Sequence, residues 1–140
     1  MRKFLGLAVG SLLCALALTT TSMADTGWDF SVESVRASAE KSRTGNYYRV
    51  YVGVFNESTN RTYDGYGTVK VVLKLTNPDG GDEIFRETEE IEIKNGSSEK
   101  VEFSFNRDIH YSYLDYRVGL ESSGGGVFDS ESGDVRVDWD

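Results

Sequence analysis

Apolar side chains at every second position recur along this chain, and this period of two constrains the fold more than any other feature. Successive side chains of a β-strand point to opposite faces, so strict alternation predicts a strand with one buried face. The first run changes parity between Val32 and Val35, which predicts a β-bulge near Glu33-Ser34. The later alternating sets are Tyr48, Val50, Val52 and Val54; Val69, Val71, Leu73 and Leu75; Val101, Phe103 and Phe105; Leu114, Tyr116, Val118 and Leu120; and Val135, Val137 and Trp139.

Turn signals separate these runs. Asn77 to Gly81 holds the only proline of the chain and two glycines, and Asn95-Gly96 is a dipeptide typical of tight hairpins. The spacing predicts seven or eight strands and no helix, arranged as an antiparallel sandwich around one core. We therefore expect a single all-β domain over residues 25–140.

The first residues follow a different pattern. The basic pair Arg2-Lys3 precedes an apolar run from Phe4 to Leu18. After that run, Ser22-Met23-Ala24 fits the small-x-small rule of signal peptidase. This order is typical of a secretory signal, and the run is shorter than the ~20 apolar residues of a membrane span. Residues 1–24 are therefore predicted to be a cleavable signal peptide.

Cleavage would define the exported protein. The only cysteine, Cys14, lies in the signal, so the mature chain would have no disulfide, thiol nucleophile or thiolate metal site. Two basic residues leave with the signal, and the 13 basic and 23 acidic residues that stay give a net charge of about −10. Such a surface repels nucleic acid and anionic lipid. We expect a periplasmic or secreted domain, not inserted in a membrane, whose oligomeric state these patterns do not specify.

Part of the chain resembles a known class of module. One predicted strand, Val50-Tyr51-Val52-Gly53-Val54-Phe55-Asn56, ends in asparagine. Two turn segments and the start of another strand follow it along the chain: Asn77-Pro78-Asp79-Gly80, Asn95-Gly96-Ser97-Ser98 and Val101-Glu102-Phe103. Over residues 30–122 this pattern resembles the bacterial immunoglobulin-like modules of the cell-adhesion-related (CARDB) and FxLYD type, although the Tyr-Asp pair of FxLYD modules is missing. The resemblance implies a seven-stranded immunoglobulin/fibronectin-III-like sandwich with an extracytoplasmic binding or structural role. It carries over no catalytic residue.

The residues that catalysis needs are scarce. His110 is the only histidine, and no Gly-x-Ser-x-Gly segment is present to hold a nucleophilic serine. Carboxylates are plentiful, but a domain this small leaves little room for the cleft that glycoside hydrolysis needs between two of them. The sequence therefore predicts a protein that is not an enzyme.

Aromatic residues near two predicted loops indicate a binding site. One loop contains Tyr63 and Tyr66, and the other runs from Ser122 to Ser132. In an immunoglobulin-like strand order both loops reach the same end of the sandwich, where tyrosine suits a binding surface. We expect a non-catalytic module of the bacterial envelope that binds a protein or glycan partner through Arg61, Tyr63, Tyr66, Phe128 and Asp129. In the alternative, these rings fold back and cap the core.

Two other functions fit the same sequence. The terminal stretch Asp134–Asp140 is a candidate edge strand that pairs with another chain, as in chaperones or fibre subunits. A calcium-stabilised adhesion module is the second alternative, because calcium prefers oxygen ligands. The candidate ligands are Asn77, Asp79, Asp82 and Glu83 in one stretch and Asp129, Glu131 and Asp134 in another, neither with EF-hand spacing. No other cofactor is expected.

Overall fold

A computed structural model describes residues 28–58 and 65–140 of this chain, and these residues form β-strands and no helix. The seven strands are β2 (Phe30–Ser42), β3 (Gly45–Asn56), β4 (Tyr66–Thr76), β5 (Glu83–Lys94), β6 (Ser98–Arg107), β7 (Tyr113–Glu121) and β8 (Val127–Trp139). The prediction of an all-β fold is confirmed. Over the described ranges, no helix is long and apolar enough to cross a membrane. The predicted signal peptide, residues 1–24, lies outside the described residues.

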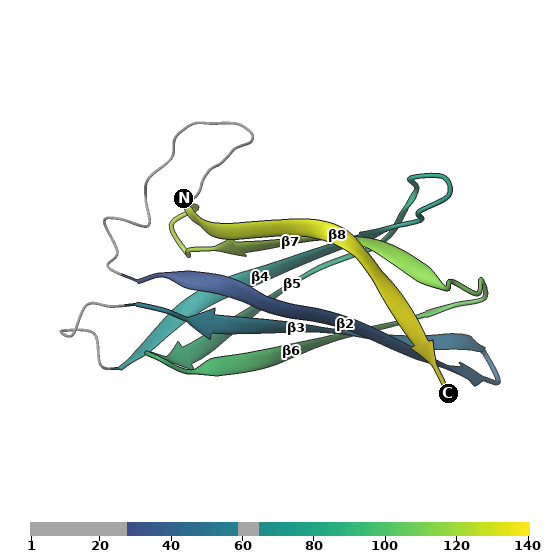
Figure 1. Ribbon diagram of the computed structural model, residues 1–140, viewed down its shortest axis with the longest axis horizontal. Helices are drawn as coiled ribbons and strands as arrows, with labels where there is room; N and C mark the ends of the chain where they lie inside the picture. The colour runs from purple at the N-terminus through teal and green to yellow at the C-terminus, as the bar shows by residue number, and fades with distance from the viewer. Residues whose placement is uncertain (1–27, 59–64) are drawn as a thin grey trace.

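The strands are hydrogen-bonded in the order β5-β4-β7-β8-β2-β3-β6. Each neighbouring pair is antiparallel except β2 and β8, which run parallel where Ala37–Ala39 faces Val137–Trp139. The expectation of a wholly antiparallel sandwich is therefore wrong at this pair. The reason is the length of β8, which lies beside β7 as far as Arg136 and then crosses to β2 (Figure 1).

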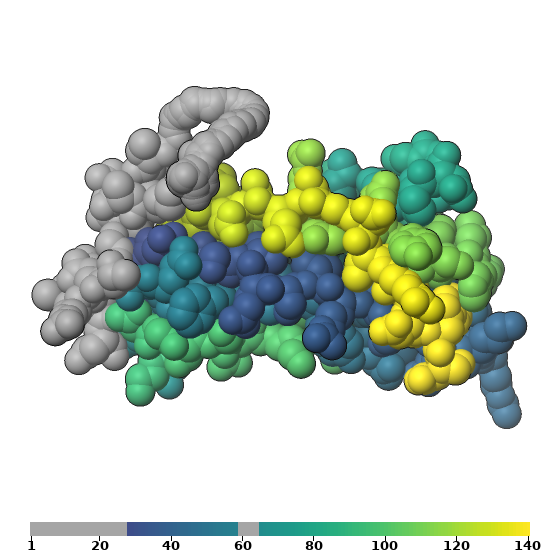
Figure 2. All heavy atoms as spheres, in the orientation of Figure 1, coloured from purple at the N-terminus to yellow at the C-terminus, as the bar shows by residue number. Residues whose placement is uncertain are grey.

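The sheet folds over on itself, so that its two outermost strands, β5 and β6, approach one another. Phe85 of β5 stacks on Phe105 of β6 with ring centroids 4.9 Å apart. The Arg107 guanidinium of β6 donates a hydrogen bond to the backbone carbonyl of Ile84 over 2.7 Å. On the opposite side, side chains of β8 lie along β2 in the space-filling view (Figure 2). The two halves of the sheet thus enclose one core.

The alternating residues supply that core, as their spacing predicts. The sets on β3 and β4 are completely buried: Tyr48, Val50, Val52, Val54, Val69, Val71, Leu73 and Leu75. Burial of a side chain of this size contributes about 1.5–3 kcal/mol, so these two strands contribute a large part of the stability of the domain. The outer face of β4 carries Thr68, Lys70, Lys74 and Thr76.

The predicted bulge in β2 is confirmed. The register of β2 against β3 shifts between Val32 and Ser34. Gly53 lies opposite Ser34, and a Cβ atom at that glycine would come within 2.6 Å of the Ser34 hydroxyl oxygen. The glycine therefore allows the close approach that the extra residue of the bulge requires.

Candidate functional site

The first predicted binding loop lies partly outside the described residues. Arg61 and Tyr63 fall in the gap at residues 59–64, so their share of the predicted site stays a prediction. Tyr66 is described: it begins β4, pairs with Lys94 of β5, and has 65% of its surface exposed. Its ring is therefore free to contact a ligand.

The prediction that Phe128 lies in a binding loop is wrong. Phe128 is the second residue of β8 and only 8% exposed, and its ring packs edge-to-face on Phe30 with centroids 4.9 Å apart. The register of β7 against β8 shifts between Leu120 and Glu121, and Glu121 pairs with Val127. At this shift the side chain of Phe128 points into the core. Phe128 is a core residue.

Asp129 bridges β8 and β2 instead of extending from a loop. Its carboxylate accepts hydrogen bonds from the backbone N–H groups of Val32, at 3.0 Å, and Ser130, at 2.9 Å. Burial raises the pKa of Asp129, the two N–H groups lower it in part, and the carboxylates of Glu131 and Glu57 raise it further. The predicted loop position is therefore wrong, and Asp129 satisfies a backbone donor at the edge of β2.

The first acidic stretch is engaged in its own turn. The side-chain oxygen of Asn77 accepts a hydrogen bond from the N–H of Asp79. Glu83 pairs with Arg86 at 2.8 Å, and the pKa of Glu83 is lowered chiefly by that hydrogen bond. Two of the four candidate ligands, Asn77 and Glu83, thus already have partners.

The second acidic stretch lies in strand β8 and not in a loop. Asp129 and Glu131 share one face of the strand, whereas Asp134 has the opposite parity and lies on the other face. The three carboxylates therefore do not converge, and this expectation of the calcium alternative is wrong. In the described part of the chain, no group of three or more His, Cys, Asp or Glu side chains is arranged to hold a metal ion.

The terminal strand is not an edge strand. β8 lies between β7 and β2 in the strand order, so the prediction that Asp134–Asp140 forms an edge is wrong. The outermost strands are β5 and β6, and both carry exposed charged residues, including Glu87, Glu89, Glu99 and Lys100. Charges along an edge disfavour pairing with another chain.

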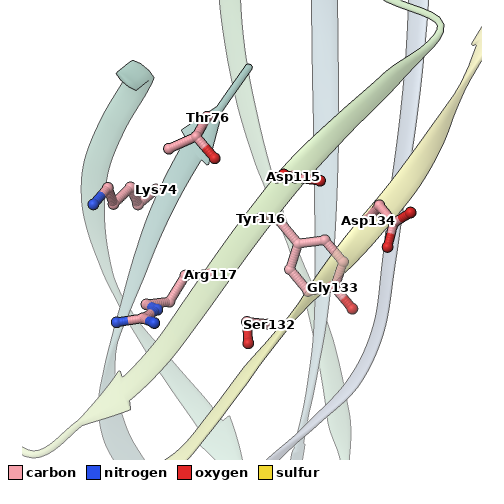
Figure 3. Close-up of a pocket in the computed structure, with 8 residues that line it drawn as sticks. All are labelled: Lys74, Thr76, Asp115, Tyr116, Arg117, Ser132, Gly133 and Asp134. Atoms are coloured by element: carbon pink, nitrogen blue, oxygen red, sulfur yellow. The ribbon is translucent and has the colours of Figure 1, made fainter. Parts of the chain in front are cut away.

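A hollow of about 420 Å³ lies on the outer face of β4, β7 and β8. Two rows of cross-strand neighbours build it. Lys74, Arg117 and Ser132 face one another in one row, and Thr76, Asp115 and Asp134 face one another in the next. Figure 3 shows Lys74 and Arg117 projecting from neighbouring strands, with Asp134 across from them on β8. The floor is formed by β7, and both walls carry polar side chains.

A second hollow, of about 440 Å³, continues from the first toward the turns at one end of the sheet. Asp134 lines both hollows. The second is also lined by Tyr113, which is 51% exposed, and by two turns, residues 77–79 and 110–112. We call the two hollows together the β7–β8 groove.

The loop that lines the far end of the groove is held firmly. The buried hydroxyl of Tyr48 donates a 2.6 Å hydrogen bond to the carbonyl of Ile109 and accepts a 2.9 Å bond from the N–H of Tyr111. The His110 ring stacks on Trp139 at 4.1 Å, and the Trp139 indole donates to the carbonyl of Tyr111. The groove is therefore largely preformed at this end.

Tyr116 lies beneath the groove, on the face of β7 that packs against the core. Its hydroxyl donates a 2.7 Å hydrogen bond to Glu131. Burial, followed by that hydrogen bond, raises the pKa of Tyr116 to about 12, so the hydroxyl stays protonated at neutral pH. The ring lies against Gly133, where a Cβ atom would come within 3.3 Å of the Tyr116 hydroxyl oxygen. Glycine at this position allows the ring to lie close under β8.

The charged residues of the groove face residues of the same charge on the neighbouring strand. Lys74 faces Arg117, and Asp115 faces Asp134. Like charges directly opposite each other destabilise a sheet. In the described part of the chain, no hydrogen bond or ion pair engages any of these four side chains. From outside the groove, Glu83 attracts Lys74, and this attraction adds to the hydrogen bond that chiefly lowers the pKa of Glu83.

Sequence reasoning missed Lys74, Arg117 and Asp115, and it singled out Asp134 only as a candidate calcium ligand and as the start of a candidate edge strand. The outward parity of Lys74 is readable from the alternation of Leu73 and Leu75. What brings Lys74 to Arg117, and Asp115 to Asp134, is the cross-strand register, and a pattern within one strand does not contain it. The two Asp residues are close only because β8 begins at Val127 and pairs with β7.

No protein-family model matches this sequence, and no curated protein matches it either. Solved structures do share the fold. The C-terminal domain of Wzt superposes with a TM-score of 0.53 at 14% identity, over 77% of this chain and 72% of that chain. A glycosyl hydrolase family 2 member from Bacteroides cellulosilyticus has a TM-score of 0.55 at 11% identity, over 79% of this chain.

A β-glucosidase from Erythrobacter marinus, EmGH1, has a TM-score of 0.51 at 15% identity, also over 79% of this chain. This chain spans only 15% of the length of each of the two glycoside hydrolases. At these identities the likeness shows a common fold and nothing about activity.

Proposed function

We propose that this chain is an exported, non-catalytic binding module of the bacterial envelope, and that its ligand lies in the β7–β8 groove. The observation that carries the proposal is the set of four charged side chains in the groove, Lys74, Arg117, Asp115 and Asp134, which form like-charged cross-strand pairs and make no hydrogen bond or ion pair within the described residues. Like charges directly opposite each other disfavour folding, whereas a polar ligand would be held by them.

The strand order supports an immunoglobulin- or fibronectin-III-like sandwich, with β2, β3 and β6 on one side and β5, β4, β7 and β8 on the other. Such sandwiches carry ligand sites on their faces and loops and need no catalytic centre. The basic, apolar and small-residue order of residues 1–24 supports export.

The groove chemistry supports binding without catalysis. Asp115 and Asp134 are the carboxylates that face one another in it, but Asp134 is exposed to solvent. A glycosidase general acid requires a carboxyl in apolar surroundings. His110, the only histidine of the chain, is stacked on Trp139. The groove thus offers charged and polar contacts and no developed acid–base pair.

Blocking the groove tests the proposal. Ser132 lies in the groove and Ser104 lies on the outer face of β6; both are exposed strand residues. The full chain, Ser132→Trp and Ser104→Trp would be expressed with the native leader, purified after export, and sedimented with isolated bacterial envelopes. We expect the wild type and Ser104→Trp to bind and Ser132→Trp to stay in the supernatant.

Circular dichroism melting would establish that both tryptophan variants are folded. Binding that Ser132→Trp leaves unchanged would refute the groove as the site. A chain that stays in the cytoplasm with its leader attached would refute export.

A further inference from the structure

The β7–β8 groove also indicates a class of ligand, an inference that rests on the proposed function. We infer that the groove binds a glycan that carries both an acidic and an amino substituent. The two like-charged pairs supply the reason: Lys74 with Arg117 is a site for an anion, and Asp115 with Asp134 is a site for a cation.

The two charged pairs are neighbours along the same strand. Asp115 and Arg117 are two residues apart on β7, which places the pairs about 7 Å from each other on one face of the sheet. A carboxylate between Lys74 and Arg117 and an ammonium between Asp115 and Asp134 would remove both repulsions at once. A ligand with one charge only would leave one pair uncompensated.

The rest of the groove suits a sugar chain. Hydroxyl or amide groups line it at Thr76, Asn77, Ser112 and Ser132, and each can donate and accept a hydrogen bond. The exposed ring of Tyr113 offers an aromatic surface with a polar tip at the same face. The two hollows are neighbours that share Asp134, so a sugar chain lying across both could place more than one unit.

A polypeptide partner fits this surface less well. Peptides that bind sheets as added strands need a free edge, whereas β7 is hydrogen-bonded to strands on both sides. Protein interfaces depend on a few buried aromatic or apolar anchors, and Tyr113 is the only large exposed apolar side chain that lines the groove among the described residues.

The net charge of the chain limits the class of ligand further. At −8 for the full sequence, the protein repels a ligand that carries only negative charge. An amino substituent on the sugar offsets that repulsion and adds a contact to the carboxylate pair. A neutral sugar would avoid the repulsion but would leave the four charges of the groove unpaired.

Three oligosaccharides with one backbone provide the test. The first alternates glucuronic acid and glucosamine, the second has its amines acetylated, and the third has its carboxyls reduced to alcohols. Isothermal titration calorimetry with the exported chain should give the tightest binding for the first, by about tenfold over each of the others, because each loses one charged contact.

Two variants assign the charges. We expect Arg117→Met to bind the first and third oligosaccharides equally, since it no longer recognises the acid. We expect Asp134→Asn to bind the first and second equally, since it no longer recognises the amine. Lys70→Met, on the same strand as Lys74 but outside the groove, should keep the wild-type order of affinities.

Equal affinities of the wild type for all three oligosaccharides would overturn the inference. Absence of binding to any of the three, or capture of a protein through the groove, would also overturn it. If Ser132→Trp still abolishes envelope binding in these cases, the proposed function stands and only the class of ligand is wrong. If Ser132→Trp binds envelopes like the wild type, the proposed function fails as well.

Discussion

Lys74 of β4 lies directly opposite Arg117 of β7, so two cations face each other across neighbouring strands. Four residues earlier on β4, Lys70 lies between Glu90 of β5 and Glu121 of β7. One strand thus places one lysine among acids, as sheet stability favours, and a second lysine beside a cation. Sheet stability accounts for the position of Lys70, whereas the position of Lys74 is explained by the ligand that we propose for the groove.

We expect Lys74→Glu to raise the free energy of unfolding of the ligand-free chain by about 0.5 kcal/mol, because the new carboxylate would face Arg117. The same change should weaken envelope binding, since it removes half of the cation pair. Urea denaturation at low salt measures the first effect and envelope sedimentation the second.

Lys70→Glu is the matched control, because it would place a third acid between Glu90 and Glu121. It should lower the free energy of unfolding by a similar amount and leave envelope binding intact. If both variants change the free energy of unfolding in the same direction, the cross-strand register does not determine these energies.

The stability of the domain should depend on pH through Asp29. Burial, and then the carboxylate of Glu57, raises the pKa of Asp29 from 3.8 to about 6, and Asp129 of β8 adds to the shift. Between these pH values the unfolded chain loses the proton first, so the folded state loses stability as the pH rises from about 4 to about 6. Below that window the penalty is absent, and above it the penalty is complete.

Asp29→Asn should therefore stabilise the protein at pH 7 by about 1 kcal/mol, a value that allows for solvent screening of this half-exposed carboxyl. At pH 4 the variant and the wild type should unfold together. Asp138→Asn, an exposed position on β8, serves as the control and should follow the wild type at both pH values. Denaturant titrations at pH 4, 5, 6 and 7 measure the difference, and parallel curves for Asp29→Asn and wild type would contradict it.

The fold was predictable wherever one face of a strand is apolar. The alternation from Tyr48 to Val54 and from Val69 to Leu75 placed each of those side chains in the core, and the change of parity after Val32 located the bulge. These features depend on residues near one another in sequence, so a local pattern contains them.

The start of β8 was not predictable in this way. Residues 129–134 are Asp, Ser, Glu, Ser, Gly and Asp, which read as a loop because no apolar alternation is present. They form a strand because their backbone is hydrogen-bonded to β7, and because the carboxylate of Asp129 accepts a hydrogen bond from the N–H of Val32 in β2. Because the sequence predicts a loop over this stretch, it places Phe128 in a loop instead of the core. The pairing of β7 with β8, which forms the groove, could not be predicted for the same reason.

Tyr48→Phe should destabilise the protein by about 1–3 kcal/mol. The variant keeps the buried ring but leaves the N–H of Tyr111 without its partner and the carbonyl of Ile109 with only the 3.2 Å bond from the Asn46 amide. Tyr47→Phe is the neighbouring control on the opposite face of β3, where the ring lies against Arg49, and it should change stability by less than about 0.5 kcal/mol. Thermal melts of the three proteins, followed by near-ultraviolet circular dichroism, would show a large loss for Tyr48→Phe alone.

Phe128→Ala and Tyr66→Ala separate the core from the surface. We expect Phe128→Ala to lower the free energy of unfolding by about 3–5 kcal/mol, because it leaves a cavity beside Phe30. Tyr66→Ala removes a largely exposed ring and should cost less than about 0.5 kcal/mol. Both values come from denaturant unfolding of the purified chains. A Phe128→Ala variant as stable as the wild type would return Phe128 to the surface, where the sequence alone places it.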